Sequence, residues 1–80
     1  MSTAQKVLTV LAEVSEFNEV ARDLNVRLYD KQILDSMKTV ELILAFSRTF
    51  GVDISPAEFD REDWSTPGKI VSYMEGKLGP

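Results

Sequence analysis

The sequence predicts an all-α fold, a bundle of three longer helices and one short helix, with a long loop between the first two longer helices. Three segments carry apolar residues at helical spacing, and helix-capping residues precede these segments. The period-two alternation typical of strands appears only briefly. The chain has 80 residues and shows no linker or internal repeat, so we expect residues 1–80 to form a single domain.

The first helix is expected from about Thr3 to Glu16. Ser2 and Gln5 before it have the spacing of a capping box, in which each side chain accepts a hydrogen bond from the other residue's backbone N–H. The apolar residues that we expect on its inward face are Val7, Leu8, Leu11 and Val14. From Phe17 to Asp35 the periodicity lapses, which predicts a long loop packed on the bundle. Its expected apolar anchors are Leu24, Leu28, Tyr29, Ile33 and Leu34.

The second helix is expected from Ser36 to Phe50, ending at Gly51, because a residue without a β-carbon readily takes the left-handed cap conformation. Its surface carries two apolar stripes at a rotation of about 100° per residue. One stripe consists of Thr39, Leu42, Ile43, Phe46 and Phe50. The opposite stripe consists of Met37, Val40, Glu41, Leu44 and Arg48.

A helix that is apolar on two sides is either covered on both or exposes one stripe to a partner. In the first alternative, the long loop covers Met37, Val40 and Leu44. In the second, these residues form the apolar centre of a transient interface with Glu41 and Arg48 at its rim. We favour the second alternative and predict Met37, Val40, Glu41 and Leu44 as partner-binding residues.

Two further helix starts follow. Ser55 as N-cap, Pro56 at the first helical position and Glu58 as the capping-box partner predict a short third helix. Thr66 as N-cap and Pro67 then open the last helix. Its expected inward residues are Ile70, Val71, Met74 and Leu78. Between the two helices, Phe59 and Trp64 are expected to plug the bundle, and Asp60 and Arg61 to hold the turn.

Composition excludes several classes of function. The chain has 9 Lys and Arg against 13 Asp and Glu, a net charge of −4, which argues against nucleic acid as a partner. It has no cysteine and no histidine, so disulfides and thiolate or imidazole metal sites are absent. The acidic run from Glu58 to Trp64 lacks the spacing of an EF-hand loop, and we predict no metal. The first residues do not resemble a signal peptide or a membrane span, so we expect a cytoplasmic protein without membrane insertion.

The Asp35–Ser36 pair at the start of the second helix is the candidate functional site. Without histidine, Ser36 has no imidazole base, and Lys38 lies two residues away on another part of the helix, so a catalytic serine is not expected. One alternative is that Ser36 only caps the helix. The other is that Ser36 carries a phosphate group, because unpaired N–H groups and the positive end of the helix dipole favour an anion there.

The stretch LDSMKTVEL, from Leu34 to Leu42, resembles the attachment site of acyl and peptidyl carrier proteins. The resemblance implies an acyl-carrier-like bundle in which a phosphopantetheinyl transferase moves 4′-phosphopantetheine from coenzyme A onto Ser36, next to Asp35. The prosthetic group would then bring the thiol that the chain lacks. Ser36 would be a substrate of another enzyme, and the chain itself would not be an enzyme.

A second stretch, EFDREDWSTPGKI from Glu58 to Ile70, resembles the D-alanyl carrier proteins of teichoic acid D-alanylation. This similarity implies D-alanine as a thioester on the arm, a D-alanine-adenylating ligase that loads it, and a membrane-bound O-acyltransferase that receives it at the inner face of the membrane. We expect a monomer. The helix from Ser36 to Phe50 carries Lys38 and Arg48 against Glu41, a formal charge of +1, unlike the acidic helix of many fatty acid carriers. A carrier for another acyl or aminoacyl group, and a helical interaction module without prosthetic group, remain as alternatives.

Overall fold

The computed structural model describes residues 2–55 and 60–78, which form an α-helical bundle without a β-strand in either stretch. The longer helices are α1 (Thr3–Ser15), α2 (Ser36–Phe50) and α3 (Pro67–Leu78). Within the described residues, the short 3₁₀ helices η1 (Asn18–Ala21) and η3 (Arg61–Trp64) accompany them. The all-α prediction is therefore confirmed. The predicted short helix after Ser55 falls mainly on residues 56–59, which lie outside the described residues.

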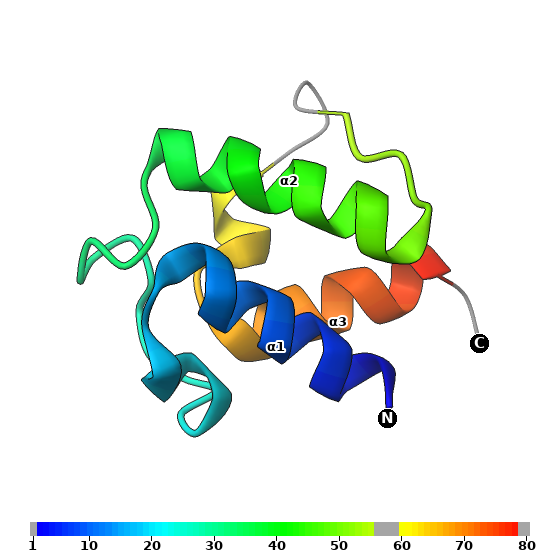
Figure 1. The fold of residues 1–80 in the computed structure, drawn as a ribbon. Helices are drawn as coiled ribbons and strands as arrows, with labels where there is room; N and C mark the ends of the chain where they lie inside the picture. The colour runs from blue at the N-terminus through cyan, green and yellow to red at the C-terminus, as the bar shows by residue number, and fades with distance from the viewer. Residues whose placement is uncertain (1, 56–59, 79–80) are drawn as a thin grey trace.

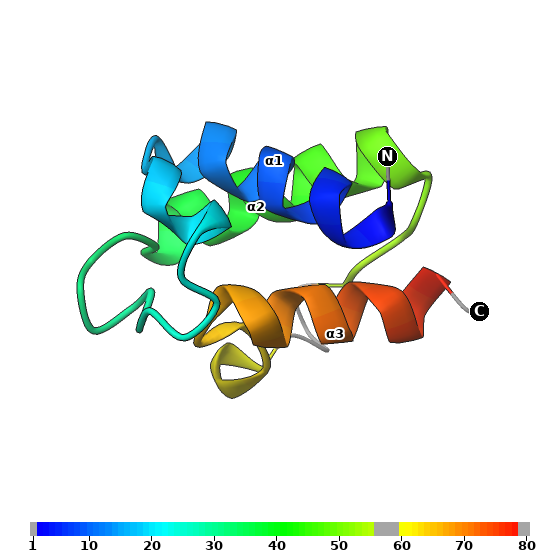
Figure 2. The same ribbon diagram turned by 90° about the horizontal axis from the view of Figure 1, so that it is seen from below.

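The three longer helices form two layers. Helices α1 and α2 lie side by side (Figure 1), and α3 packs beneath them (Figure 2). The loop between α1 and α2 occupies one end of the bundle, and the start of α1 and the end of α3 lie toward the other end (Figure 1). The start of α2, which contains Ser36, therefore lies at the loop end. None of the helices in the described stretches is long and apolar enough to cross a membrane.

One hydrophobic core joins the helices and the loop. Its buried residues are Val7, Val10, Leu11, Val20, Val26, Leu28, Ile33, Leu34, Leu42, Ile43, Phe46, Ile54, Trp64, Ile70 and Met74. Trp64 of η3 is fully buried, and its ring meets Phe46 and Tyr73 edge to face, with centroid distances of 5.6 and 5.7 Å. The predicted plugging by Trp64 is confirmed, whereas Phe59 lies outside the described residues.

Helix α1 begins as predicted and ends one residue earlier. Ser2 and Gln5 form both hydrogen bonds of the capping box, each 3.2 Å long. Glu16 is the C-cap in the left-handed conformation, with φ 60°. The predicted inward face was partly wrong, because Val10 is buried while Leu8 and Val14 are only half-buried. The reason is that α1 contacts both α2 and α3, which moves the centre of its buried face toward Val10.

The loop between α1 and α2 is held by buried side chains and by backbone hydrogen bonds. The predicted anchors Leu28, Ile33 and Leu34 are buried, as expected. The prediction of Leu24 as an apolar anchor was wrong, because its side chain is 45% exposed. Its carbonyl instead accepts a hydrogen bond from the N–H of Gly68 at the start of α3 (3.0 Å), and the N–H of Leu28 donates to the carbonyl of Ser65 (2.9 Å). A β-carbon on residue 68 would lie 3.1 Å from the Leu24 carbonyl oxygen, so glycine permits this approach.

Helices α2 and α3 begin where predicted, and the predicted C-cap of α2 and N-cap of α3 are present. Helix α2 ends at Gly51 with φ 68°, the left-handed conformation that glycine takes without strain. The hydroxyl of Thr66 accepts from the N–H of Lys69 at 3.2 Å and caps α3. Of the predicted inward residues of α3, Ile70 and Met74 are buried, whereas Val71 and Leu78 are half-buried.

Candidate functional site

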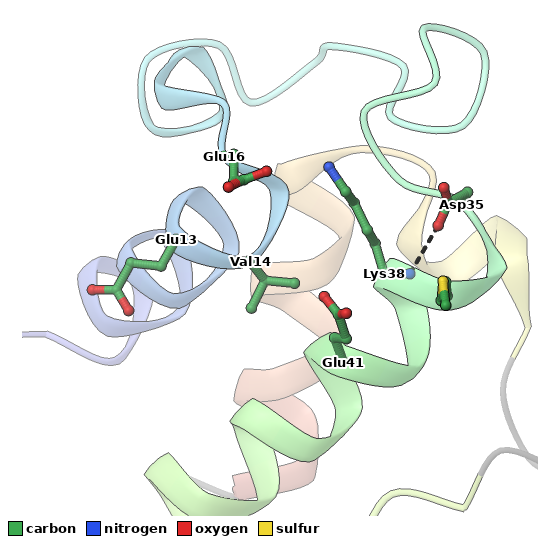
Figure 3. A pocket seen from close by; sticks show the side chains of 7 residues that line it. Glu13, Val14, Glu16, Asp35, Lys38 and Glu41 are labelled. Carbon is green, nitrogen blue, oxygen red and sulfur yellow. Dashed lines mark hydrogen bonds between the residues drawn. The ribbon is translucent and has the colours of Figure 1, made fainter.

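Asp35, and not Ser36, is the N-cap of α2. Its backbone is extended, and its Oδ1 accepts a hydrogen bond of 2.8 Å from the N–H of Lys38 (Figure 3). This corrects the alternative in which Ser36 caps the helix. Ser36 stands at the first helical position and is exposed. Because Asp35 provides the cap, the Ser36 hydroxyl is not needed for helix stability.

The peptide that joins Asp35 to Ser36 is held by Thr39. Both the N–H and the hydroxyl of Thr39 donate to the carbonyl oxygen of Asp35, at 2.9 and 2.7 Å. The phenol of Tyr29 lies 2.7 Å from the same Thr39 hydroxyl. From the sequence, Tyr29 is expected as an apolar anchor of the loop and Thr39 on the inward stripe of α2, and neither expectation includes this polar link. The signal available in the sequence was a hydroxyl group within the otherwise apolar inward stripe of α2.

The ring of Tyr29 is itself held between elements distant in sequence. The guanidinium carbon of Arg61 in η3 lies 4.5 Å from the ring centroid, the distance of a cation–π contact. Burial raises the pKa of the Tyr29 phenol above its usual value of 10.0, and the hydrogen bond with Thr39 and the charge of Arg61 oppose that effect. The phenol is therefore protonated at neutral pH. Asp60 holds the turn before η3, as predicted, by accepting from the N–H of Glu62 at 3.0 Å.

An open groove of about 410 Å³ runs between the end of α1 and the start of α2 (Figure 3). Its lining residues are Glu13, Val14, Glu16, Asp35, Met37, Lys38 and Glu41. The Lys38 ammonium donates to the carbonyl of Ser15 at the end of α1, at 3.2 Å, and so joins the two helices. Carboxylates outnumber cations along this lining, so the surface beside the start of α2 is negatively charged.

The outer stripe of α2 is solvent-exposed. Met37 is 75%, Val40 50% and Leu44 54% exposed, and Glu41 beside them is also exposed. The alternative in which the loop covers this stripe was therefore wrong. The loop packs instead against the opposite side of the helix start, where Tyr29 meets Thr39. An exposed row of large apolar side chains on one helix is typical of an interaction surface.

Metal binding has no support in the described part of the chain. Within residues 2–55 and 60–78, no group of three or more histidine, cysteine, aspartate or glutamate side chains could hold a metal ion.

Comparison with known proteins places this geometry in a family. Residues 5–74 match the family model described as a phosphopantetheine attachment site. The chain is 42% identical to the D-alanyl carrier protein of Lacticaseibacillus rhamnosus, over 86% of this chain and 85% of that protein. It is 40% identical to the D-alanyl carrier protein of Bacillus velezensis, over 92% and 95%. It is 36% identical to that of Listeria monocytogenes serotype 4a, over 94% and 96%.

Proposed function

The chain belongs to the phosphopantetheine attachment family, together with the D-alanyl carrier proteins, and we propose that it holds D-alanine as a thioester on a prosthetic arm at Ser36. Members of this family are carriers that act with separate enzymes, and 4′-phosphopantetheine is their covalently attached group. When bound, that group supplies the thiol that forms the thioester. Residues 1–80 would act as one carrier domain.

The observation that carries the proposal is the environment of Ser36. The hydroxyl is exposed at the first position of α2, while the neighbouring Asp35 provides the cap. N–H groups of a first helical turn that are not capped project from the helix end, where they favour a phosphodiester. Asp35 takes the N–H of Lys38, so the two preceding N–H groups, of Ser36 and Met37, would be available to a phosphate attached at this helix end.

Attachment at Ser36 would be a phosphoryl transfer carried out by a separate phosphopantetheinyl transferase. The Ser36 oxygen forms a bond to the phosphorus that bears the pantetheine of coenzyme A. The bond from that phosphorus to the bridging oxygen breaks, and adenosine 3′,5′-bisphosphate leaves. The serine proton passes to a base supplied by the transferase.

Two further enzymes complete the proposed cycle. A D-alanine-adenylating ligase loads the thiol in the cytoplasm, and a membrane-bound O-acyltransferase receives the D-alanyl group at the inner face of the membrane, for transfer to teichoic or lipoteichoic acid. We propose that Met37, Val40 and Leu44 dock to these enzymes, with Glu41 at the rim. Their exposure next to Ser36 supports this assignment, since a partner bound there would lie beside the arm. The carrier would act as a monomer and would not enter the membrane.

Intact-mass measurement tests the attachment site. The protein is incubated with coenzyme A and a phosphopantetheinyl transferase, and Ser36→Ala is compared with Ser72→Ala, which removes an exposed serine from α3. We expect one phosphopantetheine on the wild type and on Ser72→Ala, and none on Ser36→Ala. A mass gain in Ser36→Ala would refute Ser36 as the attachment site. Loading trials of the holo protein with D-alanine, L-alanine and fatty acids then test the cargo, and preferential loading of a fatty acid would refute D-alanine.

A further inference from the structure

A directed chain of hydrogen bonds leads from the long loop to the residue that precedes Ser36. Thr39 has one hydroxyl proton, and its hydroxyl donates to the carbonyl oxygen of Asp35 at 2.7 Å. In the 2.7 Å contact between the Tyr29 phenol and the Thr39 hydroxyl, Tyr29 must therefore be the donor. The chain runs from the Tyr29 O–H to the Thr39 oxygen, and from the Thr39 O–H to the Asp35 carbonyl.

The acceptor at the end of this chain belongs to the peptide bond that joins Asp35 to Ser36. Because that peptide is planar, fixing its carbonyl oxygen also fixes the direction in which the backbone enters Ser36. The Thr39 N–H donates to the same oxygen at 2.9 Å, so both groups hold one peptide plane. Thr39 is buried, and the low local dielectric there makes its hydroxyl bond stronger than it would be in water.

The donor at the start of the chain is also well held. Tyr29 is half-buried, and its ring lies against the guanidinium of Arg61 at 4.5 Å. The N–H of Gln32 donates to the Tyr29 carbonyl at 3.1 Å, which closes a turn of the loop around this residue. The loop, η3 and α2 therefore meet at one phenol, at the end of the bundle that bears Ser36.

We propose that Tyr29, acting through Thr39, is a positioning residue for transfer of phosphopantetheine to Ser36. This inference rests on the proposed attachment at Ser36. Tyr29 does not touch the reacting atoms. It holds the Asp35–Ser36 peptide so that the serine oxygen is aligned for attack on phosphorus, an alignment that contributes to the rate of the chemical step.

The main test is Tyr29→Phe in the full-length apo protein, with Tyr73→Phe as the matched control. Both substitutions keep the aromatic ring and remove one phenolic hydroxyl. Tyr73 serves as the control because it lies on α3 against Trp64 and outside this series of hydrogen bonds. Coenzyme A and an excess of a phosphopantetheinyl transferase are added, and single-turnover rates are followed by intact mass. This design reports chemistry and not product release.

We expect Tyr29→Phe to lower the maximal single-turnover rate about fivefold, the equivalent of one neutral hydrogen bond. The transferase concentration at half-maximal rate should stay within about twofold of the wild-type value, because the outer stripe of α2, the proposed docking surface, is unchanged. Tyr73→Phe should change neither quantity. A wild-type rate for Tyr29→Phe, an equal loss in both variants, or a change confined to the half-maximal concentration would each overturn the proposal.

Variants of Thr39 separate positioning from general destabilisation. Thr39→Ser keeps the hydroxyl and should keep most of the rate, whereas Thr39→Val removes the hydroxyl at similar volume and should lose at least as much as Tyr29→Phe. The double variant Tyr29→Phe/Thr39→Val should be no slower than Thr39→Val alone, since both changes break the same series of hydrogen bonds. Additive losses would show that the two residues act independently. If Thr39→Val does not fold, the contrast between Tyr29→Phe and Tyr73→Phe still decides the question.

The failure of this inference can be told apart from failure of the proposed function. Ser36→Ala in the same assay must gain no mass. If it does gain mass, the attachment site is elsewhere and the proposed function is wrong. If it gains none while Tyr29→Phe reacts at the wild-type rate, the attachment site stands and the positioning role of Tyr29 is wrong.

Discussion

Substitution of Val40 by aspartate separates partner binding at the outer stripe of α2 from the stability of the fold. Val40 is 50% exposed, so folding removes about half of its side chain from water. Full burial of a valine side chain contributes at least about 1.5 kcal/mol, and Val40→Asp should therefore lower the free energy of unfolding by about 0.7 kcal/mol. For a domain of this size that is a decrease of about 3–6 °C in the melting temperature.

The effect on binding should be much larger. If Val40 lies at the centre of a docking interface, Val40→Asp places a carboxylate in a desolvated contact and should cost about 2 kcal/mol or more, about 30-fold in Kd. Titration calorimetry of the holo protein with the D-alanine-adenylating ligase measures this Kd, and circular dichroism melting measures stability.

Leu24→Asp is the matched control for Val40→Asp. Leu24 is similarly exposed at 45% but lies in the loop, so its substitution should cost similar stability and leave Kd unchanged. A wild-type Kd for Val40→Asp, or a larger loss of affinity in Leu24→Asp than in Val40→Asp, would mean that the partner docks on another face. A collapse of the Val40→Asp melt would contradict the observed exposure of the stripe.

Three other predictions concern stability. Asp35→Ala should lower the free energy of unfolding by about 1 kcal/mol through loss of the α2 cap, whereas Asp35→Asn, which keeps an acceptor, should be close to wild type in a urea titration. Gly51→Ala should destabilise by about 1 kcal/mol because φ is 68°, and Gly76→Ala within α3, where a β-carbon meets nothing within 4 Å, should stabilise by about 0.5–1 kcal/mol; thermal melts with the same sign for both would contradict this. The hydrogen bond from Lys69 lowers the pKa of Glu62 from its usual 4.5, so the pair stabilises the fold above that pH and the contribution is lost as pH falls through the lowered pKa; Lys69→Met should return the Glu62 pKa, followed by NMR, to its usual range.

The helices could be predicted because their signals are local. The start of α1 follows from Ser2 and Gln5, and the end of α2 follows from Gly51, and each of these residues acts within a few positions of the chain. The boundaries of α2 needed no knowledge of the partners across the core. The inward face of α1 was predicted less well, because it depends on the two helices that α1 contacts, which no short stretch of sequence encodes.

The loop between α1 and α2 could not be predicted in the same way. Its buried apolar side chains were largely predicted, but the hydrogen bonds that tie it to the segment around the start of α3 join Leu28 to Ser65 and Leu24 to Gly68 through backbone atoms. Any residue except proline can donate or accept such bonds, so the sequence offers no pattern for them. This is why Leu24 was expected to act through its side chain and instead acts through its carbonyl.

The residues of the candidate site also differ in whether a local stretch of sequence could predict them. Ser36 and Asp35 could be proposed from a short motif because their positions at the helix start are local. The contact between Tyr29 and Thr39, by contrast, needs the loop to fold back on α2 and η3 to bring Arg61 against the ring. Such an arrangement depends on the whole bundle. A substitution that breaks the contact between the loop and η3 should therefore change the backbone position of Ser36, although neither segment contains Ser36. If Tyr29 has the proposed positioning role, the packing of the loop and η3 around it would also set the backbone direction at Ser36, the proposed attachment residue.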